Sequence, residues 1–414
     1  MTPQERQGWF IVGCLFVAML LVFGSGYDTT PTFLPALLKT FGWSRAKTSL
    51  IPSLLALSLG LCVIPVGWAL DRFEAKFVML VGTIAAGAAF MLASRAHSFF
   101  AMASAYLLLG VGIAAGTVIP ASFVVANWFG ARRGLAMGIT SAGTTTGGMV
   151  MNLVAARVIA AHGLRAAYFV LAIPIFAIVV PLVTLTVRSR APGAVRMSVA
   201  EAGAKLDGFD TSVAFRTRSF WMIVLAQFCF ALAATGVLIH FNQYLIDLHY
   251  SAAAAANAVS LSFGITTVGK ILMGAFADRI SARIALAVSF VVQAVALVLA
   301  LGATHLWIMA LFVLTFGATF AVPLMLIPLL IAESMGLRRY GSISGITAVA
   351  NTIGAALGPI VSGWIFDFAH SYTIAFEVYI VIYLLGAIAS WACRPYAVER
   401  ELTFRATAVA SVSA

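Results

Sequence analysis

Three ionisable side chains lie inside long apolar stretches of this sequence: Asp28, His240 and Lys270. A charged lysine near the centre of a bilayer costs at least about 2.5–3.5 kcal/mol, so such a residue faces a polar cavity and meets an anion. Histidine titrates near neutral pH and can carry a proton. These residue types predict the binding of an anion and the movement of protons.

Lys270 is the first candidate for a substrate-binding residue. It precedes Asp278 by eight residues, which places it about 12 Å inside the nearer end of its helix, too deep for its ammonium group to reach water easily. The alternative interpretation is a structural ion pair within the helix bundle.

Asp28 and His240 are the candidates for proton coupling. Asp28 follows Gly8 by about 30 Å of helix, so it lies towards the outer end of its span, either as a proton acceptor or gate or as a carboxylate in contact with water. His240 forms a polar patch with Asn242 and Gln243; the alternative is a hydrogen-bonded packing histidine.

Asn351 and Thr117 could donate hydrogen bonds to a carboxylate or hydroxyl group, although packing is at least as plausible for each. The sequence contains no catalytic triad, phosphate-binding loop or metal-ligand cluster, so we expect no enzyme activity, no cofactor and no metal. The four cysteines are far apart and are interpreted as packing residues: Cys14, Cys62, Cys229 and Cys393.

The composition decides the class of protein. Of 414 residues, 62% are hydrophobic and only 9% are charged, whereas soluble proteins carry about 25% charged residues. Soluble enzymes and nucleic-acid binders are therefore excluded, and each long apolar run is predicted to be a membrane-spanning helix. The runs cover residues 8–38, 48–70, 77–94, 98–126, 134–161, 167–187, 219–247, 253–277, 284–302, 305–333, 341–367 and 372–393.

The chain has a net charge of +11, and the distribution of its basic residues is explained by membrane orientation rather than by nucleic-acid binding. Most Lys and Arg residues outside the runs fall in the N-terminus, the even-to-odd loops and the C-terminus, which predicts that both termini are cytoplasmic. The expected fold is an all-α membrane protein with twelve transmembrane helices.

Two motifs recur and divide the chain into parallel six-helix halves. Gly67–Arg72 is repeated as Gly274–Arg279, and Gly130–Arg133 is repeated as Gly336–Arg339 at nearly the same offset. The predicted domains are 1–187, a cytoplasmic linker at 188–218, a second half at 219–393 and a cytoplasmic tail at 394–414. Parallel halves with a site between them are typical of transporters that work by alternating access.

The charged residues of these repeated loops predict a gate at the cytoplasmic side. Carboxylates there can pair with basic groups or helix ends and hold that side shut. The alternative is a tight loop that merely carries positive-inside charges. The predicted gate residues are Asp71, Arg72, Arg132, Arg133, Asp278 and Arg279.

Motif and repeat together resemble the major facilitator superfamily over the whole chain. The segment from Trp128 to Gly138, continued by Ala142, Gly143 and Gly147, is similar to the helix 4–5 motif of the monocarboxylate transporter family, near the bacterial oxalate/formate exchangers. The family's other motif is partly present at residues 7–10. The spacing of the small residues in the helix 4–5 motif also allows close helix packing.

The resemblance implies roles for two residues, and this sequence departs from the family at other positions. Lys270 matches a helix 8 arginine that binds the carboxylate, and Tyr27 matches an aromatic residue lining the exchangers' cavity. Thr266 and Thr32 stand where the animal transporters carry an aspartate and a lysine, so their proton relay does not transfer. The exchangers carry a second cation, whereas the matching residues 347–351 here contain none. A single cation matches a single carboxylate, so the charge count favours a monoanion.

The expected function is therefore proton-coupled symport of small monocarboxylates such as lactate or pyruvate. The alternatives are an organic-anion exchanger of the oxalate/formate type without proton coupling, and a membrane sensor or scaffold without turnover. The expected partners are a small carboxylate, protons and the lipid bilayer, with no nucleic acid and no obligate protein partner. The expected location is the plasma membrane, which is the inner membrane in a bacterium.

Overall fold

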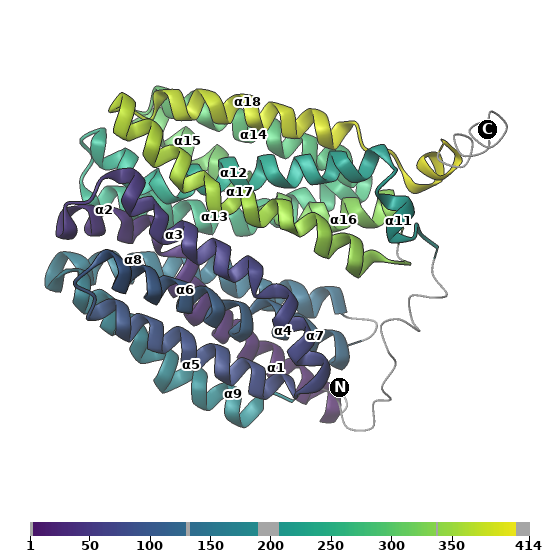
Figure 1. Cartoon of the computed structure of the whole chain (residues 1–414), viewed down its shortest axis with the longest axis horizontal. Coiled ribbons are helices and arrows are strands. Elements are labelled where there is room, and N and C mark those ends of the chain that lie inside the picture. Colours follow the sequence, from purple (N-terminus) through teal and green to yellow (C-terminus); the bar gives the residue numbers. More distant parts are fainter. Residues whose placement is uncertain (1–2, 130–132, 189–206, 337, 403–414) are drawn as a thin grey trace. The chain divides into compact units, whose positions relative to one another are not determined.

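The computed structural model describes residues 3–129, 133–188, 207–336 and 338–402 (Figure 1). Within these ranges the chain is built of helices, and an antiparallel bridge joins Gly208 to Gly336. The elements of the first half are α1 (Pro3–Ala18), the π-helix η1 (Met19–Asp28), α2 (Thr30–Phe41), α3 (Arg45–Leu61), α4 (Val63–Arg72), α5 (Ala75–Ser94), α6 (Phe99–Gly116), α7 (Val118–Trp128), α8 (Arg133–Pro174), η2 (Ile175–Val179) and α9 (Val180–Thr186). Those of the second half are α11 (Thr211–Ala214), α12 (Arg218–Asp247), α13 (Ala252–Arg279), α14 (Ala282–Leu301), α15 (Leu306–Thr319), α16 (Pro323–Met335), α17 (Tyr340–Ala369) and α18 (Thr373–Trp391).

The predicted number of membrane crossings agrees with these helices. Eleven helical segments among the described residues are long and apolar enough to cross a membrane. One of them, Ala136–Thr186, has 51 residues, or about 76 Å of helix, which is more than twice the hydrocarbon thickness of a bilayer. The chain bends within it at Gly163, whose φ of 82° and ψ of 176° are not helical. That segment is two crossings, and the total is the predicted twelve.

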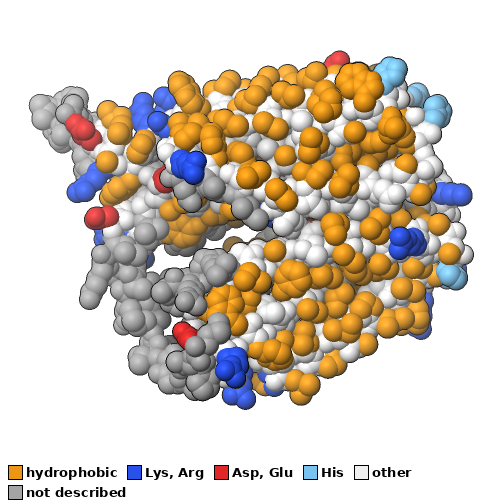
Figure 2. Space-filling view, turned by 180° about the vertical axis from the view of Figure 1, so that it is seen from behind, with side chains coloured by type: hydrophobic (Ala, Val, Ile, Leu, Met, Phe, Trp, Pro, Cys, Tyr) orange, Lys and Arg blue, Asp and Glu red, His pale blue; other side chains and the backbone are white. Residues whose placement is uncertain are grey.

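The outward surfaces of the helices are apolar, as a lipid environment requires. Phe100, Leu185 and Phe368 expose 81%, 80% and 82% of their surface. Figure 2 shows hydrophobic side chains over much of the visible face, with most Lys and Arg side chains towards its two ends. A water-soluble protein does not expose so much apolar surface, so this face is adapted to lipid.

The chain divides into two compact units. The first comprises Met1–Ala194, Thr235–Thr267 and Ala355–Ala375; the second comprises Val195–Ala234, Val268–Gly354 and Phe376–Ala414. The first unit thus packs the N-terminal helices together with parts of α12, α13 and α17. The two six-helix halves predicted from the repeats remain a prediction.

Buried aromatic residues form part of the core of the first unit. The fully buried ring of Tyr168 stacks on Phe33 with 4.3 Å between ring centroids. Its hydroxyl lies 2.9 Å from the hydroxyl of Tyr106, so both polar ends are satisfied inside an apolar core.

Small residues let α8 pack closely against the first helix. A methyl group on Gly147 would lie 2.5 Å from the carbonyl oxygen of Leu20, and one on Gly24 would lie 2.5 Å from the Cα of Gly147. Gly143 is equally close to the backbone of Phe16. By contrast, Gly138 has open space beside it. The small-residue contact predicted from the sequence is confirmed at Gly143 and Gly147 and absent at Gly138.

Adding a methyl group at Gly147 should therefore weaken the fold. Gly147→Ala forces α8 away from η1, and overpacking of this kind costs about 1–3 kcal/mol. We expect a lower apparent melting temperature of the detergent-solubilised protein. Gly138→Ala is the matched control and should melt like the wild type; equal melting temperatures for both variants would contradict the packing described.

Candidate functional site

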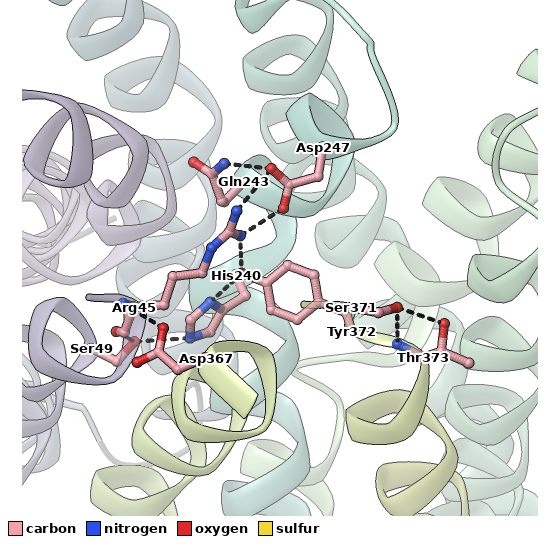
Figure 3. Close-up of polar contacts among 9 residues, drawn as sticks. All are labelled: Arg45, Ser49, His240, Gln243, Asp247, Asp367, Ser371, Tyr372 and Thr373. Atoms are coloured by element: carbon pink, nitrogen blue, oxygen red, sulfur yellow. Dashed lines mark hydrogen bonds and ion pairs between the residues drawn. The ribbon is translucent and has the colours of Figure 1, made fainter. Parts of the chain in front are cut away.

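Six polar residues from three helices and one loop form a connected group in the first compact unit (Figure 3). We call this group the Arg45 network. α3 contributes two residues, α12 two, the C-terminal part of α17 one, and the segment between α17 and α18 one. The members are Arg45, Ser49, His240, Asp247, Asp367 and Tyr372.

The guanidinium group of Arg45 lies at the centre. Its Nη1 and Nη2 atoms lie 2.6 and 2.9 Å from the two carboxylate oxygens of Asp247, which also accepts a hydrogen bond from Gln243 Nε2 at 2.8 Å. The guanidinium carbon lies 3.4 Å from the centre of the Phe366 ring. The side chains of Arg45 and Asp247 are only 14% and 29% exposed, so this two-pronged pair is partly withdrawn from water.

Asp367 binds the N-terminus of α3. Its two carboxylate oxygens accept hydrogen bonds from the backbone N–H groups of Arg45 and Ala46, both at 2.9 Å. Ser44 accepts a further bond from Lys47 N at 3.2 Å. The first N–H groups of a helix have no partners within the helix and carry partial positive charge, so a carboxylate stabilises them. A residue of α17 thus caps a helix 322 positions away in the sequence.

The hydrogen bonds of His240 place a proton on its Nε2 atom. Its Nε2 lies 3.1 Å from the carbonyl oxygen of Pro359, which can only accept, so Nε2 carries a proton. Its Nδ1 lies 2.8 Å from the Tyr372 hydroxyl. That hydroxyl also accepts from Arg45 Nη1 at 2.6 Å, so it links the guanidinium group to the imidazole ring.

The remaining hydroxyl groups complete the same pattern. Ser49 donates to the carbonyl oxygen of Arg45 at 2.7 Å, and its Oγ lies 3.0 Å from Nε2 of His240, from which it accepts. Burial raises the pKa of the Tyr372 hydroxyl above its usual value, so this group stays protonated and can act as a donor. Every donor named here has an acceptor.

A glycine allows α17 to approach α3 at this point. A methyl group on Gly363 would lie 2.8 Å from both the carbonyl oxygen of Arg45 and the Ser49 hydroxyl. The backbones of the two helices are therefore in near contact beside the network, and a larger residue would separate them.

A second polar group lies where the first helix is distorted. Asn152 donates to the backbone carbonyl of Asp28 at 2.8 Å, and Thr32 donates to Asn152 Oδ1 at 2.7 Å. Asp28 ends the ten-residue π-helix η1 and is only 5% exposed. π-Helical turns are frequent at functional sites. The structure thus buries Asp28, against the alternative of a carboxylate at a water-facing rim.

Lys270 lies on the side of α13 that faces away from lipid. Leu261, Val268 and Leu272 of this helix are 57%, 57% and 65% exposed. At 100° per residue, Lys270 is about 160–200° around the helix from each of them. Thr267, one turn earlier, donates to the Thr145 hydroxyl of α8 at 2.9 Å. The ammonium stem therefore starts on the interior face, and the residue is half-buried.

The other predicted substrate residues are distributed over both units. Tyr27 is half-buried against Phe23, and Thr117 uses its hydroxyl on the carbonyl of Ile113 at 2.6 Å. Both belong to the first unit, whereas Asn351, which is half-buried on α17, belongs with Lys270 to the second. Their grouping around one substrate remains a prediction.

The predicted cytoplasmic gate lies partly outside the described chain. Arg72 and Arg279 are exposed, and the guanidinium carbon of Arg72 lies 3.8 Å from the centre of the Trp68 ring. Arg132 is outside the described residues, and the described side chains do not include those of Asp71, Arg133 or Asp278. The gate therefore stays a prediction.

No group of three His, Cys, Asp or Glu residues able to hold a metal occurs within the described ranges. The four cysteines are free. Burial raises the pKa of the Cys393 thiol to about 12, so it stays protonated and is a poor nucleophile. This environment agrees with a packing role for that cysteine.

Sequence analysis missed most of the Arg45 network. The sequence analysis assigned no role to Arg45, Asp247 or Asp367. One signal was present: the two acidic residues and the arginine all end or begin runs on the same predicted side of the membrane. His240 was found, but its partners are up to 191 positions away and no local pattern joins them.

The Major Facilitator Superfamily profile matches residues 14–268 and 245–413. The chain belongs to the Major Facilitator Superfamily. Family and fold make it a multi-pass membrane transporter rather than an enzyme. Solved structures with the same fold include a D-xylose-proton symporter, with a TM-score of 0.73 at 16% identity over 94% of this chain and 98% of that one. The nucleoside transporter NupG gives a TM-score of 0.75 at 14% identity over 92% and 99% of the two chains.

Relatives by sequence are also transporters. The uncharacterized MFS-type transporter YcxA of Bacillus subtilis is 23% identical over 94% of this chain and 95% of its own length. Monocarboxylate transporter 9 of Rattus norvegicus is 29% identical over 35% of this chain and 28% of its own length.

The Arg45–Asp247 pair should show strong energetic coupling. In a double-mutant cycle with Arg45→Ala and Asp247→Ala, we expect a coupling of about 1.5–3 kcal/mol, because the bonds are short, charged and partly buried. The exposed pair Arg338–Asp210, at 3.5 Å and with side chains 47% and 43% exposed, is the control and should give about 0–1 kcal/mol. Apparent unfolding free energies in detergent provide the measurement, and similar couplings would refute the distinction.

Proposed function

We propose that this chain transports small monocarboxylates, of the size of lactate or pyruvate, together with protons by alternating access. The observation that carries the proposal is the position of Lys270. It is a basic residue in an apolar span, and it lies opposite the most exposed apolar residues of α13 rather than among them. Cations in such positions face the bundle interior or a water-filled cavity.

The charge type of Lys270 favours an anionic substrate. A carboxylate brought to the ammonium group in a medium of low polarity gains more from the charge pair than it would in water. A single cation is matched by a single carboxylate, which favours a monoanion over a dianion. Carrying a proton with the anion makes the cargo neutral overall, and Asp28 and His240 are the candidates for binding that proton.

The sequence relatives support the same substrate class over part of the chain. The rat protein named monocarboxylate transporter 9 aligns over about a third of this sequence. The motif from Trp128 to Gly147 belongs to the same family resemblance. The solved structures support the fold, and their own substrates are a sugar and a nucleoside.

The Arg45 network fits a conformation closed on one side. It joins α3 of the first half to α12 and α17 of the second through an ion pair, a helix cap and the His240 hydrogen bonds. With the N-terminus in the cytoplasm, the start of α3 is at the outer side, so this conformation would have its outer side shut. Alternating access then requires the network to break in each cycle.

Removing Lys270 should strongly reduce transport. In proteoliposomes that contain a pH-sensitive dye, Lys270→Ala should reduce lactate-dependent proton uptake by about 10–100-fold, since a hydrogen-bonded charge pair is worth about 1.5–3 kcal/mol. Lys270→Arg keeps the charge and should retain part of the activity. Lys39→Ala, at the exposed end of α2, is the matched control and should behave like the wild type.

Two outcomes would overturn parts of the proposal. Unchanged uptake in Lys270→Ala removes Lys270 from the mechanism. Uptake of labelled lactate that requires internal carboxylate and leaves the internal pH unchanged identifies an exchanger without proton coupling in place of a symporter.

A further inference from the structure

Two buried polar side chains on neighbouring helices of the second compact unit have no hydrogen-bond partner among the described residues. Gln293 of α14 leaves both its amide nitrogen and its amide oxygen unpaired, and Tyr383 of α18 leaves its hydroxyl unpaired. Both residues are 0% exposed. We propose that Gln293 and Tyr383 together form a buried water-binding site between α14 and α18. This inference does not depend on which substrate the chain transports.

Packing around Phe290 places the two side chains opposite each other. The Phe290 ring lies 6.1 Å from the Tyr383 ring, centroid to centroid, and a methyl group on Gly386 would lie 3.0 Å from the Phe290 ring. α14 and α18 lie side by side and are the ninth and twelfth crossings, so they run in opposite directions (Figure 1). Gln293 follows Phe290 by one turn on α14, and Tyr383 precedes Gly386 by one turn on α18. The two polar side chains therefore lie at the same depth on facing sides.

Burial without partners would make these groups costly. A donor or acceptor that loses its hydrating water and gains no partner lowers the folding equilibrium constant by about fivefold or more. The first unit contains the contrasting case, because its fully buried Tyr168 has the Tyr106 hydroxyl at 2.9 Å. Gln293 and Tyr383 need the same kind of partner, and within the described residues the chain does not supply one.

The chemistry of the two side chains selects water as the ligand. An amide and a phenol offer N–H and O–H donors and acceptor lone pairs, which match the two to four hydrogen bonds of a buried water. Neither group is charged, and the next residues on the same face of α14, Phe290 and Leu297, are apolar and fully buried. An ion would lack a counter-charge there. Two groups bridged by one water lie about 5–6 Å apart, which agrees with facing side chains that do not bond directly.

Substitutions that remove the polar groups test the site by the sign of their effect. Gln293→Met and Tyr383→Phe nearly keep the shape of each side chain. If one water bonds both groups, each single variant leaves the water and the other group short of a partner, so the apparent melting temperature should fall by about 2 °C. The double variant removes both groups and should recover most of that loss. Without the water, each change replaces an unpaired polar group by an apolar one and should leave the melting temperature unchanged or raise it.

X-ray radiolytic labelling of the full chain in detergent detects the water directly. Hydroxyl radicals formed from a bound water oxidise the side chain next to it, so Tyr383 should be labelled although it has no exposed surface. Tyr168 is the matched control, since it is equally buried but already paired with Tyr106, and it should stay unlabelled. In Gln293→Met the labelling of Tyr383 should be lost.

Either measurement can overturn the inference. Equal labelling of Tyr383 and Tyr168, or single variants that melt at or above the wild-type temperature, would show that no water bridges α14 and α18. If Gln293→Met does not fold, Tyr383→Phe and the labelling of the wild type still decide the question. Lactate uptake with Lys270→Ala tests the transport proposal separately, so failure of one proposal is distinguishable from failure of the other.

Discussion

The structure depends on the requirement that charge and hydrogen-bonding groups withdrawn from water must have partners. The start of α3 concentrates this requirement, because it presents free N–H groups and a guanidinium group among apolar helices. Asp367 and Asp247 meet it from two other helices. The same groups would be hydrated if the contact opened, so the net free energy of closing is a small difference between large terms. A contact of this kind can hold a conformation and still be reversed.

Close backbone packing determines which charges can meet. At Gly363 the absence of a side chain lets α17 come near enough for Asp367 to reach the end of α3. At Gly147 the absence of a side chain likewise lets α8 pack against η1, the helix that ends at Asp28. In lipid there is little hydrophobic force between helices, so small residues and polar contacts set their separation. Helix packing and the polar contacts between helices therefore depend on the same few positions.

Composition and periodicity were sufficient to predict the helices but not the long-range contacts. The twelve crossings follow from apolar runs, since only helices satisfy the backbone in lipid, and the family follows from the repeated loop motifs. The partners of Arg45 could not be predicted, because each lies about 200 or more positions away and depends on the direction in which a helix end points. His240 was identified by its residue type alone. Its hydrogen-bond partners could be assigned only after the carbonyl of Pro359 and the hydroxyl of Tyr372 were located.

For the transport proposed above, a proton site separate from the anion site is sufficient for coupling. Lys270 and His240 lie in different compact units, and no direct contact between them is needed if both ligands act on one conformational equilibrium. An anion that binds one state better shifts the population towards that state, and a proton that binds one state better does the same. Each ligand then changes the affinity for the other by an equal factor, through the helices that move.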